Sequence, residues 1–385
     1  MNERARNAPA PAAAAEAAGS HQSGLAFAVG VPASADEQDL AGALASLVVG
    51  AERVRRPYEI VVAINGPEPA VATASAASFA AAAGLTLVRD DADEPRGEAG
   101  VPDARQDAGR PVVRLLRLAR RSKAGAWNAI RAATRAPAVV FADADVRVAP
   151  EAISLLLARL AAEPHLAVIV GREVAQLTPA DGLVARAAAL PYRFDFGNVP
   201  GRLYALRLAA LPEPMPFDVV AEDAYLTVRL GRAGFAREPA ALVYLRPPTT
   251  WGEYVRQRVR CEVGKIEIAR RFPELLATHG FGRTPWRAFM REIEIREYPL
   301  VAVLLGVRLY GHLRALEEVR TGICTGWEVL PSTKRWPAEY ARARSVAGPA
   351  GGGAHGDAEP CAHESGARRA GAGAGPIAPG GATGS

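Results

Sequence analysis

The sequence contains few lysines, few cysteines and no long apolar run. Only three of its 46 basic residues are lysines, so the other 43 are arginines. Its three cysteines are too few for a disulfide framework and too scattered for a zinc site, which favours a reducing compartment. Near the C-terminal end the longest apolar run, 299–307, has about nine residues, whereas a membrane-spanning helix needs roughly twenty. We therefore expect a cytoplasmic protein without a secretory signal or a transmembrane segment.

The overall composition is that of an ordinary globular protein. Hydrophobic residues make up 49% of the 385 positions and charged residues 23%, which excludes a fully disordered chain or a collagen-like repeat. The net charge of +5 is too small for a nucleic-acid-binding surface, so we expect no nucleic-acid partner. The abundance of arginine, alanine and glycine is typical of a GC-rich, bacterial-like coding sequence.

The two ends differ from the middle of the chain. Residues 1–24 are rich in alanine and proline, and residues 345–385 in glycine, alanine and proline, so both are predicted to be disordered tails. The acidic stretch 90–110 lacks apolar periodicity and is interpreted as a mobile insertion. The middle of the chain is expected to hold the folded core.

In the folded middle, apolar strands alternate with helical patterns from Leu25 to Val170. This alternation predicts an α/β fold with a mostly parallel, Rossmann-like sheet that is flanked by helices. We assign one domain to residues 25–275 and a helical C-terminal extension to residues 276–344. Ligands of such sheets bind at the carboxyl ends of the strands.

One acidic motif follows a predicted strand directly. Asp143 and Asp145 come after the apolar run 138–141, separated by one residue, so their side chains point the same way if the chain stays extended. Mg²⁺ and Mn²⁺ prefer oxygen ligands and are often shared between carboxylates and a substrate diphosphate. An acidic turn after a strand is the alternative interpretation.

Three further segments carry polar residues that could take part in chemistry. Glu222 and Asp223 open a predicted helix, where the helix dipole alone favours acids. Lys123 lies at another predicted helix N-terminus, a place that favours anions. Gln257 and Arg260 share one face of the long helix predicted for Trp251–Arg271, and such an arginine suits phosphate, although a solvated basic face is the simpler interpretation.

Taken together, these segments resemble the family 2 glycosyltransferases with the GT-A fold. The resemblance runs from about Leu25 to Arg271, with the motifs in the family's order. They are Ala28-Val29-Gly30-Val31-Pro32-Ala33 followed by Asp36-Glu37, Glu59-Ile60-Val61-Val62 with Asn65-Gly66, Lys123-Ala124-Gly125-Ala126-Trp127-Asn128, Asp143-Ala144-Asp145, Ala221-Glu222-Asp223, and Gln257-Arg258-Val259-Arg260-Cys261. The family implies an inverting transferase that moves a sugar from a nucleotide-diphosphate donor, most typically a UDP-sugar, to a hydroxyl.

The resemblance also implies a role for each matched residue. It places Pro32 and Asn65 at the nucleotide base, Lys123 beside the nucleotide, Asp143 at the ribose, and Asp145 on the Mg²⁺ or Mn²⁺ that bridges the diphosphate. Asp223 is implied as the general base that deprotonates the acceptor. The acceptor and leaving diphosphate are implied to face Glu222, Gln257, Arg258 and Arg260.

The sequence departs from the family pattern in three ways. Ile64 stands where a carboxylate often reads the base, and Cys261 replaces the tryptophan of the last motif. The family's processive polymerases also carry transmembrane helices, which we do not predict here. A single transfer to a sugar, a lipid-linked or a small-molecule acceptor is therefore favoured.

The region after the last motif permits two interpretations. Arginines flank the apolar stretch 300–307, so this helix could lie on the cytoplasmic face of an anionic membrane, or it could pack on the catalytic domain. The stretch 327–335 weakly resembles a lid that covers the nucleotide in some relatives.

Two other functions compete with a transferase. A non-catalytic nucleotide-sugar-binding protein on a degraded transferase scaffold is suggested by Ile64 and Cys261. A nucleotidyltransferase would share the sheet and the aspartates, but it usually has a Gly-rich basic loop after the first strand. Here that position holds residues 32–36, which lack glycine and any basic residue.

Overall fold

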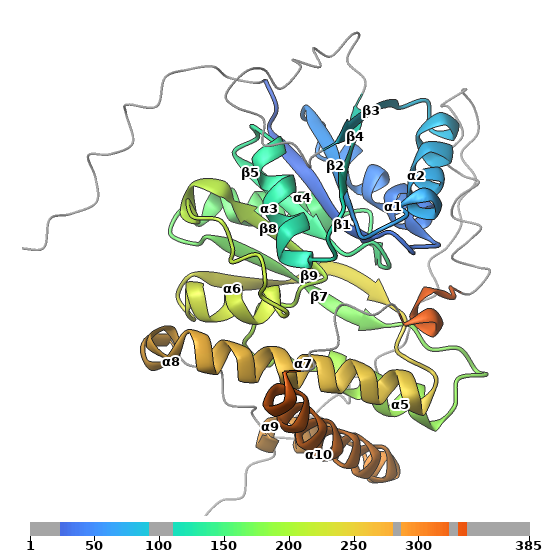
Figure 1. Ribbon diagram of the computed structural model, residues 1–385, viewed down its shortest axis with the longest axis vertical. Coiled ribbons are helices and arrows are strands. Elements are labelled where there is room, and N and C mark those ends of the chain that lie inside the picture. Colours follow the sequence, from blue (N-terminus) through green and yellow to red (C-terminus); the bar gives the residue numbers. More distant parts are fainter. Residues whose placement is uncertain (1–23, 92–110, 280–285, 323–329, 337–385) are drawn as a thin grey trace, which may run out of the picture. The chain divides into compact units, whose positions relative to one another are not determined.

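A computed structural model of the chain describes residues 24–91, 111–279, 286–322 and 330–336. The predicted tails, apart from residue 24, and most of the predicted insertion at 90–110 lie outside these residues. The first half of the sheet consists of β1 (Phe27–Ser34), β2 (Tyr58–Asn65), β3 (Thr86–Asp91), β4 (Val112–Leu118) and β5 (Ala138–Ala142). These strands pair in parallel in the order β3-β4-β2-β1-β5, as the alternation of strands and helices predicts (Figure 1).

The second half of the sheet brings in antiparallel neighbours. It contains β8 (Leu203–Arg207), β7 (Val168–Ala175), β9 (Phe235–Leu245) and the two-residue β6 (Arg147–Val148), in this order after β5. β8 is antiparallel to both β5 and β7, β9 is parallel to β7, and β6 is antiparallel to β9. The sheet is therefore mostly parallel, with antiparallel strands on one side, and the predicted fold class is confirmed.

Helices cover both faces of the sheet. On one face lie α1 (Leu40–Glu52), α2 (Ala70–Ala82) and α4 (Ala152–Ala162), and on the other α3 (Lys123–Ala133) and α6 (Glu222–Leu230). Alternation along β2 shows why: Ile60 and Val62 belong to the first core, whereas Val61 belongs to the second. Strands buried on both faces are apolar at most positions, which explains the nearly continuous apolar runs in the sequence.

The strand order reverses at β1, and this reversal positions the site. The chain proceeds from β1 to β2 on one side and later returns to β5 on the other side. The connections that follow β1 and β5 therefore leave in opposite directions, which opens a crevice at the carboxyl ends of these strands. Ser34 ends β1 here, and Asp143 directly follows β5.

Helices beyond the sheet form the C-terminal part of the described chain. The long helix α7 (Trp251–Arg271), whose bounds agree with the predicted helix, is followed by α8 (Pro273–His279), α9 (Trp286–Glu292) and α10 (Tyr298–Thr321). α10 packs against α7 and against α5 (Leu183–Ala189), a helix that the sequence pattern did not predict (Figure 1). A helical extension after residue 275 is therefore present.

One helical segment, Ile295–Thr321, is long and apolar enough to cross a membrane by length and composition. The length of the apolar run did not predict this segment, because Arg308 ends the run at residue 307 while the helix continues to Thr321. A core helix of a soluble protein passes the same test. On one face of α10, Val301, Leu304 and Ala315 are buried against the rest of the described chain.

Candidate active site

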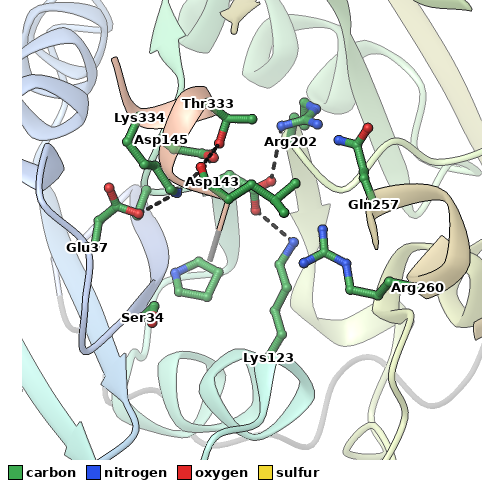
Figure 2. A pocket seen from close by; sticks show the side chains of 13 residues that line it. Ser34, Glu37, Lys123, Asp143, Asp145, Arg202, Gln257, Arg260, Thr333 and Lys334 are labelled. Atoms are coloured by element: carbon green, nitrogen blue, oxygen red, sulfur yellow. Dashed lines mark hydrogen bonds and ion pairs between the residues drawn. The ribbon is translucent and has the colours of Figure 1, made fainter. Parts of the chain in front are cut away.

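A cavity of about 630 Å³, counted with its open mouth, lies at the crevice beside β1 and β5. Residues from both halves of the sheet, from α3, from α7 and from a C-terminal segment line it (Figure 2). The lining residues are Pro32, Ser34, Glu37, Lys123, Asp143, Ala144, Asp145, Arg202, Gln257, Arg260, Leu330, Thr333 and Lys334. The structure thus brings Pro32, Lys123, Asp143, Asp145, Gln257 and Arg260 from the predicted set to one cavity.

The two aspartates reach the cavity because the strand that carries them ends there. Ala144, between them, is 5% exposed and packs into the core beneath the sheet, which leaves the neighbouring carboxylates on the open side. The backbone N–H of Asp143 donates to the carbonyl of Arg202 at 3.1 Å, so this turn is tied to β8. Side chains of both aspartates are still 16–18% exposed, so neither is sealed in the core.

Lys123 joins two of the predicted acids. It is the first residue of α3, whose N-cap Ser122 accepts a hydrogen bond from the backbone of Gly125 at 2.8 Å. Its ammonium lies 2.7 Å from Asp143 Oδ1 and 2.5 Å from Glu222 Oε1. Burial by itself would lower the pKa of Lys123, but the two carboxylates outweigh it and raise the pKa above its ordinary value.

Lys334 joins a second pair of acids in the same way. Its ammonium lies 2.8 Å from Asp145 Oδ2 and 2.5 Å from Glu37 Oε2 (Figure 2). Burial opposes ionisation of Asp145, yet Lys334 and Arg202 together hold its pKa below the usual range. For Glu37 burial is the stronger influence, and its pKa is raised. Sequence patterns did not identify Glu37 as a site residue.

The segment that delivers Lys334 is anchored to α7. The backbone N–H of Ser332 donates to Glu253 Oε1 at 2.8 Å, and the Ser332 hydroxyl accepts from the backbone of Thr249 at 3.0 Å. Leu330 and Thr333 also line the cavity. Part of the predicted lid, residues 327–329, lies outside the described residues, while its remainder, 330–335, lies at the site.

The acidic pair of α6 divides into a buried and a more accessible carboxylate. Glu222 is 5% exposed and bound to Lys123, and burial raises its pKa to about 7. Asp223 is half-buried, and its Oδ1 accepts a hydrogen bond from the backbone of Ala224 at 2.8 Å. A Cβ built on Gly201 would lie 3.4 Å from both Asp223 Cβ and Lys123 Nζ, so these two residues approach one point.

Arg202 is a cavity residue that the sequence patterns missed. It precedes β8, and its Nε lies 2.9 Å from Glu173 Oε1 while Nη1 lies 3.9 Å from Asp143 Oδ2. Burial would lower the pKa of Arg202, but the surrounding acids raise it well above the ordinary value. An arginine at a predicted strand end was a visible signal, although arginine is too common in this chain for that signal to stand out.

Four residues of the predicted set do not line the cavity: the acids Glu222 and Asp223 of α6, and two residues that lie elsewhere, Arg258 and Asn65. Arg258 follows Gln257 on α7 and is therefore rotated by about 100° around the helix axis, away from the cavity and toward α10. Asn65 is fully buried, and its side-chain amide donates to the carbonyl of Ala33 at 2.9 Å, which ties the end of β2 to β1. These two side chains therefore do not line the cavity.

The donor set suits a hard divalent cation that is shared with a substrate. Asp145 and Glu37 already hold a cationic group, the Lys334 ammonium, which shows that this position accommodates positive charge. Within the described ranges, no cluster of three or more His, Cys, Asp and Glu side chains could hold a metal ion alone. Mg²⁺ and Mn²⁺ commonly take one or two carboxylates and complete their shell with phosphate oxygens and water.

The family comparison agrees with the fold and the cavity. The model of glycosyl transferase family 2 matches residues 86–204, a stretch that contains Lys123, Asp143 and Asp145. No curated protein sequence matches the chain. The family match confirms the resemblance predicted from the motifs and indicates a family 2 glycosyltransferase domain over residues 86–204.

Solved structures of similar fold include several transferases. The mannosyltransferase PcManGT from Pyrobaculum calidifontis, in complex with GDP-Man and Mn²⁺, is 17% identical, with 84% of this chain and 80% of that chain covered and a TM-score of 0.45. S. aureus TarS 1–349 in complex with UDP-GlcNAc is 13% identical, with 80% and 95% covered and a TM-score of 0.40. Because these TM-scores lie below 0.5, the fold class rests on the family match and on the observed sheet.

Proposed function

We propose that the protein is an inverting, metal-dependent glycosyltransferase that uses a nucleotide-diphosphate sugar, such as a UDP-sugar, and a hydroxyl acceptor. The observation that carries this proposal is the joint placement of Asp143, Asp145 and Lys123 in one cavity, with Asp223 beside Lys123. In the proposed reaction the cationic side chains bind the leaving diphosphate, and the carboxylates bind the metal ion and accept the proton of the acceptor hydroxyl. The acceptor would be a sugar, a lipid-linked molecule or a small molecule.

Positive groups of the cavity would receive the donor diphosphate. Lys123 and Arg260 line the cavity from α3 and α7, so both would lie near a phosphate bound between these elements. Asp145, with Glu37 beside it, would hold Mg²⁺ or Mn²⁺. When bound, the cation would neutralise charge that develops on the leaving diphosphate. Pro32 would contact the nucleotide, and Asp143 would contact its ribose; both line the cavity.

Asp223 is the better general base of the α6 pair. Glu222 is buried and bound to Lys123, which fixes its carboxylate in place. Asp223 is more accessible, so it could accept the proton of an acceptor hydroxyl. The hydroxyl oxygen would then form its bond to the anomeric carbon while the bond from that carbon to the diphosphate breaks on the opposite side. Glu222 and Gln257 would help to place the acceptor.

Lys334 must leave its carboxylates before a metal ion binds at Asp145. Its ammonium occupies the oxygens that the cation would take. Residues 330–336 would therefore act as a lid whose lysine competes with the cation when the site holds no donor. This competition is electrostatic, since two positive groups close together on the same carboxylates repel each other.

A location in the cytoplasm, with contact to the cytoplasmic face of a membrane, is part of the proposal. Large apolar side chains of α10, among them Leu305, Leu309 and Leu313, are 45–63% exposed. A helix with such a face could lie on a membrane surface and bring a lipid-linked acceptor within reach.

The function is tested by donor turnover. The purified protein is incubated with Mn²⁺ and a panel of nucleotide sugars, and release of the nucleoside diphosphate is followed with and without acceptors. We expect Asp223→Asn to lower transfer by about a hundredfold or more, since a general base typically contributes about a hundredfold to ten-thousandfold. Asp218→Asn, which changes an exposed acid paired with Arg271, is the matched control. Equal turnover by Asp223→Asn and the parent would remove Asp223 as the base.

A further inference from the structure

Two arginines face each other where α7 packs against α10. A Cβ built on Gly311 of α10 would lie 3.1 Å from the Cβ of Arg258, so the two helices are in close contact at this point. Arg308 lies one turn before Gly311; the buried α10 residues Val301, Leu304, Val307, Gly311 and Ala315 recur at spacings of three and four, and the half-buried Arg308 directly follows Val307 at the edge of this series. This is the pattern of a helix-packing seam, where apolar residues are expected. An arginine on each side is therefore unusual.

Aromatic rings surround Arg308. Its guanidinium carbon lies 5.5 Å from the ring centre of Trp286 and 5.9 Å from that of Phe196. Burial, with Arg258 as the next contribution, lowers the pKa of Arg308. Rings can stabilise a guanidinium, but they do not neutralise its charge or the repulsion from a second one.

Neither arginine has a carboxylate partner among the residues that the structure describes. The carboxylate of Glu262 contributes to the electrostatic surroundings of both arginines. Its own contacts are with Lys265, at 2.7 Å, and with His312, at 3.5 Å. Removing a charge from water without a partner is costly, and a like charge nearby adds to that cost. A structure that keeps two such groups together is therefore expected to receive an anion there.

Unused hydrogen-bond donors lie at the same place. Tyr254, one turn before Arg258 on α7, is 1% exposed, and its hydroxyl has no hydrogen-bond partner within the described part of the chain. The Nε of Arg258 is likewise buried without a partner there. Burial raises the pKa of Tyr254 to about 12, so the phenol keeps its proton and can donate it. Buried polar atoms are rarely left unpaired in a native protein.

The pair is linked to the active-site cavity by a tyrosine. Tyr192 contributes to the electrostatic surroundings of both Arg258 and Tyr254. Its hydroxyl accepts a hydrogen bond of 3.3 Å from Arg202, which lines the cavity. Gln257, which directly precedes Arg258 on α7, also lines the cavity, so the two arginines lie near the cavity, on the side where α7 and α10 meet.

We propose that Arg258, Arg308 and Tyr254 bind an anionic group, a phosphate or a carboxylate, that is carried by the acceptor. This assignment of substrate class rests on the proposed transferase function. The guanidinium groups supply the charge, the tyrosine hydroxyl supplies a further donor, and Trp286 and Phe196 supply apolar surface beside it. This proposal explains why Arg258 lies outside the cavity that would hold the diphosphate: its side chain would bind the anion of the acceptor instead.

The experiment uses inorganic phosphate as the probe and the full chain as the protein. A saturating nucleoside diphosphate with Mn²⁺ first occupies the active-site cavity, and phosphate binding is then measured by calorimetry. For Arg308→Leu we expect the Kd for phosphate to rise at least tenfold, as expected for a lost charge-assisted hydrogen bond of about 1.5–3 kcal/mol. Arg314→Ala is the matched control, because Arg314 lies on the same helix, is exposed and pairs with Glu317 at 2.5 Å. Its Kd should stay within twofold of the parent value.

Stability separates a binding site from a structural role. Leu at position 308 would keep an apolar side chain beside Trp286 and Phe196, so without phosphate the variant should melt at the parent temperature or above it. Added phosphate should raise the melting temperature of the parent only. Tyr254→Phe, which removes one oxygen, should weaken phosphate binding about fivefold without loss of the fold. The proposal is overturned if the parent does not bind phosphate, or if Arg308→Leu and Tyr254→Phe bind it like the parent.

Two further comparisons identify the molecule that carries the anion, and a separate assay tests the transferase function independently of the anion site. Phosphorylated and unphosphorylated sugars are compared as acceptors in solution, and vesicles of phosphatidic acid are compared with vesicles of phosphatidylcholine. A preference for the charged member in either arm that Arg308→Leu removes supports the site and names its source. Equal use of charged and neutral acceptors in both arms contradicts it. Donor hydrolysis by the parent without acceptor tests the transferase function separately.

Discussion

The lysines at the carboxyl edge of the sheet have carboxylate partners, whereas the arginines at the α7–α10 contact have none among the described residues. At the sheet edge, each of two lysines lies between two carboxylates, Lys123 between Asp143 and Glu222 and Lys334 between Asp145 and Glu37. At the α7–α10 contact, Arg258 and Arg308 meet without a carboxylate among the described residues. At the sheet edge the protein's own carboxylates compensate the lysines, whereas at the α7–α10 contact the positive charge is left for a bound anion to compensate.

This difference teaches how each region should respond to a ligand. A compensated site binds a charged ligand only by exchange, because an internal partner has to leave. An uncompensated site binds by addition and should be stabilised by its ligand. Use of lysine in the first region and arginine in the second fits this view, since an ammonium is a compact point charge on a flexible stem and a guanidinium is a planar fork for oxyanions.

The largest effect is expected when a compensating lysine is removed. Lys123→Ala leaves Asp143 and Glu222 close together without their shared cation. We expect it to abolish measurable transfer and to lower the free energy of unfolding by about 3 kcal/mol, the range for breaking a buried pair. Urea denaturation and the turnover assay measure the two effects. Lys265→Ala is the matched control because Lys265 is exposed, and its loss should change stability by less than about 0.5 kcal/mol.

A second change tests exchange at Asp145. Lys334→Gln removes the ammonium that competes for the carboxylates, so without nucleotide the affinity for Mn²⁺ should rise about tenfold, equivalent to about 1.4 kcal/mol. Mn²⁺ binding is followed by electron paramagnetic resonance, which needs no turnover. Arg335→Gln, next to Lys334 and exposed, serves as the control. Unchanged Mn²⁺ affinity in Lys334→Gln would show that the lysine and the metal ion do not share a position.

The pH dependence of stability tests Glu222. Burial raises the pKa of Glu222 to about 7 from an ordinary 4.5, so the folded state binds more protons than the unfolded state between these values. The free energy of unfolding should therefore fall as the pH rises from 4.5 to 7. Relative to Glu222→Gln, which does not titrate, the parent should lose about 2 kcal/mol over this range. Parallel curves for parent and variant would contradict the raised pKa.

The smallest effect is expected at Gly201, where space rather than charge is tested. A Cβ there would lie 2.7 Å from Glu222 Oε1, so Gly201→Ala should push this carboxylate away from Lys123. We expect a loss of about 1 kcal/mol and a severalfold lower turnover. Gly306→Ala on α10 is the contrast, because a Cβ there meets nothing within 4 Å and alanine favours a helix by up to about 1 kcal/mol. If Gly201→Ala is as well tolerated as Gly306→Ala, the contact at Glu222 is not tight.

Local patterns were sufficient for most of the sheet and for half of the site. The aspartates at 143 and 145 follow a strand whose apolar run is visible in the sequence, and parallel strands bring their carboxyl ends to one edge. Lys123 begins a helix at the same edge for the same reason. Periodicity also predicted α7 with the right bounds, which placed Gln257 and Arg260 on one face. It did not predict α5, a short alanine-rich helix between polar turns.

Long-range contacts were outside the reach of such patterns. Lys334 and Asp145 are 189 positions apart, and nothing near either residue indicates the other. Glu37 and Arg202 joined the cavity for the same reason. The family motif implied that Arg258 faces the acceptor and the leaving diphosphate, but the angle between successive residues on α7 turns its side chain toward α10.

The sequence by itself determined the α/β alternation, the strand ends that carry acids and the helix start that carries Lys123, because these depend on residues close together in the chain. Tertiary structure alone decided which lysine meets which carboxylates and that two arginines face each other between α7 and α10. Those pairings depend on how distant elements pack, and packing is set by the shape and burial of many side chains together. Charge compensation in this protein is therefore a property of the fold.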